Sequence, residues 1–237
     1  DKAAKLGVRV AQVCDNLPLT GLSPGELAEL ERWAAALSVA IEVGTRGISP
    51  ANLLGHLRLT ERLRSPILRV VLDTQTHHPT EDEVVGTLGE VAPEFERVGV
   101  CLAIENHDRH KARTLARIIE RIGSRSVGVC LDTANSFGCH EGPEVVVDVL
   151  GPLAVNLHVK DFVVRRANHN MGFVIEGRPA GQGELNIPWL LEALGDRDMS
   201  AILELWTPPE SRLSATIAKE EAWAASSIAY LRQLIPQ

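Results

Sequence analysis

Short apolar segments alternate with amphipathic segments along the whole chain. The apolar segments are rich in Val, Ile and Leu and have the length of strands buried in a parallel sheet. They are Val8–Val13, Ala40–Val43, Ile67–Leu72, Val100–Ile104, Val127–Leu131, Ala154–Val159 and Ala201–Leu205. The pattern therefore predicts seven strands.

Helical spacing of apolar residues fills the intervals between these strands. One helix is expected to begin after Ser23, an N-cap residue followed by Pro24, and another after Thr80, with Glu83 three residues on. The segment 162–178 is expected to be a long loop that covers a site. Further helices are predicted over residues 50–64, 111–122, 142–151, 187–195 and 210–234.

Strands that alternate with helices indicate right-handed βαβ units and a parallel sheet. Residues 2–7 have the pattern of a helix end followed by Gly7, so we expect the first strand to lie upstream of residue 1. With that strand the chain would form a (β/α)₈ TIM barrel, as a single domain over residues 1–237. An open doubly wound sheet is the alternative, but the Gly-rich turn GxGxxG is absent after the first apolar run.

The later strands have one aliphatic face and one small or polar face. The large aliphatic positions are Leu102, Ile104, Val129, Leu131, Val155, Leu157, Leu203 and Leu205. The opposite positions are Cys101, Ala103, Glu105, Gly128, Cys130, Asp132, Ala154, Asn156, His158, Ile202 and Glu204. This alternation is typical of a narrow barrel with helices outside it.

Four of the inward positions lie at the ends of successive strands: Glu105, Asp132, His158 and Glu204. A single acidic residue at a strand end is more often a helix cap or an ion-pair partner, but barrel active sites form at this end of the strands. Three converging carboxylates would repel one another, and a divalent cation removes the repulsion. We expect one Mn²⁺ ion, with Mg²⁺, Co²⁺ or Zn²⁺ as alternatives.

Composition narrows the choice of partners. The 237 residues include 24 basic and 31 acidic side chains, which give a net charge of −7 and disfavour a nucleic-acid or membrane-surface partner. The four cysteines form no CxxC pair and indicate reduced thiols in a cytoplasmic protein. We expect a small-molecule partner, a sugar or a sugar derivative, and a homodimer or homotetramer as the candidate assembly.

Several motifs together resemble those of the xylose isomerase-like TIM barrels, the superfamily of sugar phosphate isomerases and epimerases that includes the D-tagatose and D-psicose 3-epimerases. The matching runs are Ile104-Glu105-Asn106-His107, Leu131-Asp132-Thr133-Ala134-Asn135-Ser136, Leu157-His158-Val159-Lys160-Asp161, Gly181-Gln182-Gly183-Glu184-Leu185 and Leu203-Glu204. The resemblance extends from Leu6 onward and implies the barrel fold.

The resemblance also implies roles for these residues. Glu105, Asp132, His158 and Glu204 would hold one divalent metal ion. Glu105 and Glu204 would act as an acid/base pair, in which one removes a proton from a sugar carbon and the other returns it on the opposite side. The expected function is a metal-dependent sugar isomerase or epimerase.

Five further residues are expected to contact the substrate. Arg178 precedes the Gly-x-Gly segment and resembles an arginine that contacts sugar hydroxyls. The others are His107, Asn135, Lys160 and Trp206, which closely follow the four strand ends. His107 could instead only orient Glu105, Lys160 could form an ion pair, and Arg178 and Trp206 also fit a surface loop and the core.

Three other functions remain open from the sequence. Asn135 stands where the epimerases usually have a substrate-binding His, which favours a lyase or dehydratase of the same barrel, for example one that cleaves 3-keto-C-glycosides. An apurinic endonuclease would need additional His ligands for three zinc ions, and these are absent. A non-catalytic sugar-binding barrel is the last alternative, against which both glutamates argue.

Overall fold

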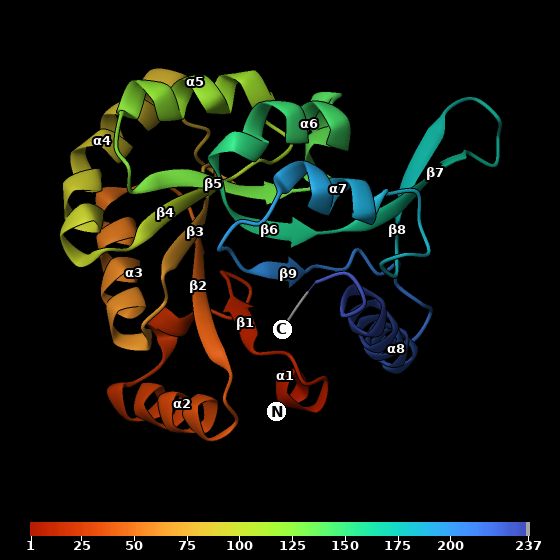
Figure 1. Cartoon of the computed structure of the whole chain (residues 1–237), viewed down its shortest axis with the longest axis horizontal. Coiled ribbons are helices and arrows are strands. Elements are labelled where there is room, and N and C mark those ends of the chain that lie inside the picture. Colours follow the sequence, from red (N-terminus) through yellow and green to blue (C-terminus); the bar gives the residue numbers. More distant parts are fainter. Residues whose placement is uncertain (236–237) are drawn as a thin grey trace.

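Seven parallel strands curve into a nearly closed barrel with helices around it (Figure 1). The computed structural model describes residues 1–235. The strands lie in the order β1 Val10–Val13, β2 Ala40–Arg46, β3 Ile67–Val71, β4 Cys101–Glu105, β5 Val127–Asp132, β6 Ala154–Val159 and β9 Ala201–Leu203. The TIM-barrel class is confirmed, and every strand predicted from the sequence is present.

The helices begin where the sequence predicts. The Ser23 and Thr80 side chains each accept a hydrogen bond from the backbone N–H of the Glu three residues later. The α-helices are α1 Lys2–Lys5, α2 Pro24–Ala36, α3 Pro50–Leu63, α4 Glu81–Val98, α5 Ala112–Ile122, α6 Pro143–Leu150, α7 Ile187–Leu194 and α8 Leu213–Leu231, and the 3₁₀ turns are Leu19–Gly21, Asn135–Cys139 and Gly151–Leu153. No helix within residues 1–235 has the length and hydropathy needed to span a membrane.

The two faces of the sheet bury separate apolar clusters. Leu102 and Ile104 belong to the large core between sheet and helices, whereas Ala103 and Cys130 form a small cluster inside the barrel. The predicted alternation therefore holds on β4 and β5. It is wrong at the start of β6, where a register shift lets Val155 pack against the inner cluster. Such a bulge changes the direction of side chains locally, and the sequence pattern does not reveal it.

The barrel wall is incomplete between β1 and β9. Within residues 1–235, β1 pairs only with β2 and β9 pairs only with β6, and the expected eighth strand is not among the described residues. A cavity of about 740 Å³ lies between these two strands, lined also by residues of α1 and α8.

A two-stranded hairpin replaces the loop expected over residues 162–178. β7 Asp161–Arg166 and β8 Phe173–Arg178 pair antiparallel and project from the barrel (Figure 1). The turn uses left-handed backbone at Asn170 and a positive φ at Gly172.

The Gly-x-Gly segment after the hairpin is held by one carboxylate. Asp161 accepts hydrogen bonds from the backbone N–H groups of Gly181, Gly183 and Leu185. A side chain at position 183 would overlap the Asp161 carboxylate, and Gly181 has a φ of +81°. The motif therefore shapes the chain between β8 and α7.

Candidate active site

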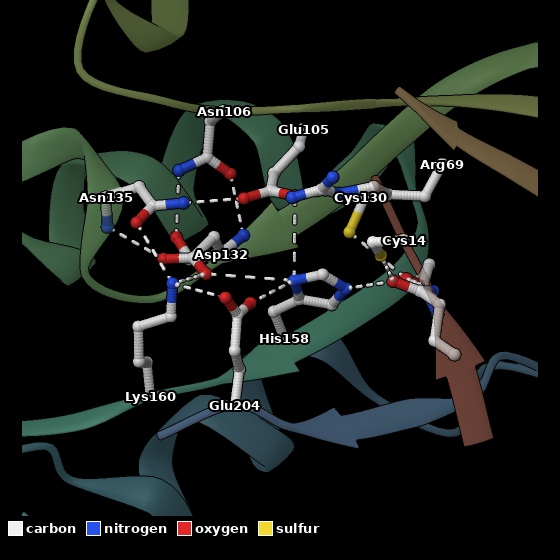
Figure 2. A network of polar contacts seen from close by, with 12 residues as sticks. Cys14, Arg69, Glu105, Asn106, Cys130, Asp132, Asn135, His158, Lys160 and Glu204 are labelled. Atoms are coloured by element: carbon white, nitrogen blue, oxygen red, sulfur yellow. Dashed lines mark hydrogen bonds and ion pairs between the residues drawn. The ribbon is translucent and has the colours of Figure 1, made fainter. Parts of the chain in front are cut away.

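The four strand-end residues predicted to act together lie together. Glu105 ends β4, Asp132 ends β5, His158 lies in β6 and Glu204 directly follows β9. One nitrogen or oxygen atom of each lies within 4.8 Å of the others (Figure 2). The first three side chains are buried, whereas the Glu204 side chain is 39% exposed.

Three atoms of this group are buried without a properly directed hydrogen bond among residues 1–235: Asp132 Oδ2, His158 Nδ1 and Glu204 Oε2. His158 Nδ1 lies 2.8 Å from Glu204 Oε2 and 3.9 Å from Asp132 Oδ2. Buried polar atoms normally have a partner, so this arrangement fits a bound cation. Carboxylate oxygens with one imidazole nitrogen suit one divalent ion.

A neighbouring thiol is a weaker candidate ligand. Cys130 also lies within reach of Glu105 and His158. Burial raises its pKa well above the ordinary value, and the nearby carboxylates raise it further. The protonated thiol is a poor metal ligand, so the oxygen-rich set is the better site.

Backbone contacts fix the orientation of Asp132. Its Oδ1 atom accepts hydrogen bonds from the backbone N–H groups of Ala134, at 2.8 Å, and Asn135, at 2.7 Å. The buried Asn106 side chain accepts from the Asp132 backbone N–H at 2.7 Å and donates to its carbonyl oxygen at 2.8 Å. Both contacts leave Oδ2 directed into the site.

The imidazole of His158 is oriented by Gln12, which the sequence analysis missed. His158 Nε2 lies 2.8 Å from Gln12 Oε1, and Gln12 Nε2 donates at 3.1 Å to both Glu42 and Asn156. Because the Gln12 amide donates to those two acceptors, its oxygen faces His158 and accepts from Nε2–H. The lone pair of Nδ1 is then available to a cation. The signal was a polar side chain inside each of two apolar strands, Gln12 in β1 and Glu42 in β2.

Glu105 is held on both oxygens. Arg69 Nε donates to Oε2 in a close ion pair, and Asn135 Nδ2 donates to Oε1 at 2.6 Å (Figure 2). Burial lowers the pKa of Arg69, but the Glu105 carboxylate outweighs it and keeps that pKa above its ordinary value. Sequence reasoning also missed Arg69, whose signal was a charged residue within the apolar strand β3.

Lys160 completes the buried charge network. Its Nζ atom lies 2.9 Å from Asp132 Oδ2 and 3.3 Å from Glu204 Oε1, and it donates to Asn135 Oδ1 at 3.0 Å. The Trp206 ring lies 4.9 Å from Nζ. Burial lowers the pKa of Lys160 and raises that of Glu204, yet the charge network prevails and brings the Glu204 pKa to about 2.

A cavity of about 370 Å³ opens above this cluster. This volume suits a small ligand. Its lining includes four of the five residues predicted to contact substrate: His107, Asn135, Lys160 and Trp206. Arg178 is not among the lining residues that the structure describes; it lies on β8, where its guanidinium is 3.5 Å from Glu176. Its contact with substrate stays a prediction.

Comparison with known proteins gives one family and one curated relative. A family model described as a xylose isomerase-like TIM barrel matches residues 1–234. The 3-oxo-isoapionate decarboxylase of Pectobacterium atrosepticum is 33% identical over 233 residues, which cover 98% of this chain and 85% of that protein.

Solved structures with the same fold are more distant. A xylose isomerase-like TIM barrel protein from Mycobacterium smegmatis in complex with magnesium is 15% identical, with a TM-score of 0.74, and the match covers 97% of this chain and 87% of that one. A D-psicose 3-epimerase determined in the presence of D-fructose is 18% identical, with a TM-score of 0.75 and coverages of 98% and 90%. At these identities the two structures establish the fold alone.

Proposed function

The chain belongs to the xylose isomerase-like TIM barrel family, and on this premise we propose that it is a metal-dependent lyase that removes CO₂ from a 3-oxo sugar acid. One observation carries the proposal: two cationic side chains, Arg69 and Lys160, are buried among the candidate metal ligands. The reaction of the curated decarboxylase relative supports it.

The charge of the site favours an anionic substrate. The three carboxylates and the two buried cations leave one net negative charge when His158 is neutral. A divalent ion would therefore give this group of side chains one net positive charge. A carboxylate of the substrate neutralises that charge directly, whereas a neutral sugar does not.

The contacts also suit the bond changes of decarboxylation. The C1–C2 bond of the 3-oxo acid breaks, CO₂ leaves, the electron pair moves toward the 3-oxo group, and C2 then takes one proton. When bound at the four candidate ligands, a divalent ion supplies Lewis acidity toward the 3-oxo oxygen. The Lys160 ammonium group lines the cavity and is the candidate proton donor. Asn135 holds that group from one side.

Glu105 is poorly placed to serve as a base. Both of its oxygens are engaged, one by a buried guanidinium and one by an amide. Decarboxylation needs a single proton donor, whereas inversion of a sugar carbon needs one group to remove a proton and a second to return it. The described contacts of Glu105 thus favour the lyase over the isomerase or epimerase.

An epimerase acting on a neutral ketose is the second candidate. Glu105 and Glu204 project from different strands toward the same space, as a reaction with two acid/base groups requires (Figure 2). The D-psicose 3-epimerase neighbour shares the fold. This candidate needs Arg69 to release Glu105 during turnover.

Product analysis separates the two candidates. Protein loaded with Mn²⁺ or Mg²⁺ is incubated with 3-oxo-isoapionate, and in parallel with D-psicose and D-tagatose, in D₂O. We expect CO₂ release above the uncatalysed rate that EDTA abolishes and added metal restores, with no inversion of the ketoses. Inversion of a ketose with no catalysed CO₂ release would overturn the proposal in favour of the epimerase.

A matched pair of lysine variants tests the proton donor. Lys160 and Lys219 each place an ammonium group over a Trp ring, but Lys219 lies on α8 outside the cavity lining. We expect Lys160→Met to lower kcat by about 10²-fold or more and Lys219→Met to leave it unchanged. Equal activity of both variants would remove Lys160 from this role.

A further inference from the structure

One buried donor in the cavity wall has no assigned ligand. Arg69 Nε donates a hydrogen bond to Glu105, but the Nη1 atom of Arg69 is buried without a hydrogen-bond partner among residues 1–235. The Arg69 side chain is only 7% exposed and lines the cavity of the candidate active site. An unpaired guanidinium nitrogen at such a position is costly, and it points to an anionic ligand.

A carboxylate of the chain itself lies close to this nitrogen without bonding to it. Asp15 Oδ1 is 3.6 Å from Arg69 Nη1, and Asp15 Oδ2 is 3.5 Å from Nε of a second arginine, Arg46. Both distances exceed those of charge-assisted hydrogen bonds. The Asp15 side chain is 44% exposed, so rotation into solvent would uncover both guanidinium groups.

The Arg69 side chain is fixed in direction by its surroundings. Glu105, whose other oxygen accepts from Asn135, anchors it at one end, and it passes beside Gly44 of β2. A side chain at position 44 would come within 3.3 Å of Arg69 Cδ and 2.5 Å of Cys14 Sγ. Gly44 therefore leaves the space that this buried guanidinium needs.

We infer that Arg69 and Arg46 form a carboxylate-binding subsite for the acid group of the substrate. In the free protein the Asp15 carboxylate occupies the place of that acid group. A carboxylate placed where the Asp15 carboxylate now lies would face two guanidinium groups, whose planar donors match its geometry. The subsite borders the candidate metal ligand Glu105, so a short acid can reach both. This inference rests on the proposed function and deepens it, because it makes the acid group the determinant of substrate choice.

Malonate is a suitable probe because its carboxyl carbons have the spacing of C1 and C3 in a 3-oxo acid. Its dissociation constant is measured by calorimetry with Mn²⁺-loaded protein at saturating metal. We expect Arg69→Lys, which keeps a cation beside Glu105 but loses the second nitrogen, to weaken binding by about 10-fold or more. We expect Asp15→Asn to tighten binding by up to about 5-fold, because the competing carboxylate is gone.

Asp148→Asn serves as the matched control, since Asp148 lies on the exposed surface of α6 and is not among the ion-pair partners of Arg69 or Arg46. It should leave malonate binding unchanged. Unchanged binding in Asp15→Asn, or wild-type binding in Arg69→Lys, would overturn the subsite. Malonate binding requires no turnover, so failure of the proposed reaction, measured separately by CO₂ release, would be recognised as such.

Discussion

The barrel wall made by β3 to β6 differs from the wall made by β1 and β9. Residues of β3 to β6 are almost all buried, whereas those of β1 and β9 are partly exposed and border the cavity between them. The buried wall supplies Glu105, Asp132 and His158, and the open wall supplies Gln12 and Glu204. Each candidate ligand of the buried wall lies on a strand that is paired with another strand on both sides. Glu204 follows β9, which within residues 1–235 pairs only with β6.

The two walls hold their candidate ligands differently. Asp132 and Glu105 are held by backbone and side-chain donors of the protein itself. Among residues 1–235, the partners of the Glu204 side chain are the charged groups of His158 and Lys160. A cation bound by all four residues would link the open wall to the buried wall. Because the two walls hold their side chains differently, we expect substitutions on the two walls to differ in their effects on metal affinity and stability.

The largest effect is expected from loss of a ligand on the buried wall. Asp132→Asn keeps the shape of the side chain but removes the negative charge, so metal affinity should fall by more than about 100-fold, the upper range for residues that only support a ligand. Activity should fall with it. Metal content after dialysis measures the effect, and Asp148→Asn on the exposed surface of α6 is the control. Full metal content in Asp132→Asn would exclude Asp132 from the site.

Stability should distinguish the two glutamates. Glu105→Gln leaves the Arg69 guanidinium buried without its counter-ion, which costs about 3–5 kcal/mol. Glu204→Gln alters a partly exposed side chain, and Lys160 keeps Asp132 as a partner, so the loss should be smaller. Denaturant unfolding in EDTA gives both values. Equal losses would contradict the contrast between the two walls.

The support that the open wall gives His158 is testable through Gln12. Gln12→Ala removes the acceptor that fixes the imidazole tautomer, and metal affinity should fall about 10–100-fold. Nitrogen NMR of metal-free protein, at a pH above the raised pKa of His158, should show Nδ1 losing its unprotonated character. Gln75→Ala, at an exposed position, is the control. A variant with unchanged affinity and tautomer would remove Gln12 from this role.

A smaller effect is expected from pH. In metal-free protein burial lowers the pKa of His158, but Glu204 and the other carboxylates outweigh it and raise that pKa above the ordinary value. Metal affinity should rise by up to about tenfold per pH unit until the raised pKa is passed, because Nδ1 must lose its proton. The stability that protonated His158 gives the metal-free protein should be lost over the same rise in pH. Affinity independent of pH between 5 and 8 would argue against His158 as a ligand.

Much of this arrangement is readable from local patterns. Period-two alternation located the strands and put Glu105, Asp132 and His158 on one face, and the register pairs Asp132 directly with His158. Partners that depend on register between strands were not readable. Arg69 pairs with Ala103, two residues before Glu105, and only this alignment brings the guanidinium to that carboxylate.

Two other features escaped for different reasons. The bulge at Val155 is set by packing between β5 and β6, and no pattern within β6 reveals it. The hairpin formed by β7 and β8 did have a local signal: the strand formers Phe162–Val164 and Phe173–Ile175 flank a turn that contains Asn170 and Gly172. The length of the connection between β6 and α7 was instead interpreted as a loop.

Anomalous diffraction from crystals grown with Mn²⁺ tests most directly whether one ion joins the two walls. The arrangement of unpaired atoms predicts a single strong peak bounded by Asp132 Oδ2, His158 Nδ1, Glu204 Oε2 and a Glu105 oxygen. The peak should disappear in crystals of Asp132→Asn grown under the same conditions. A peak elsewhere, or none at these atoms with Mn²⁺ in excess, would contradict a metal site shared by the two walls.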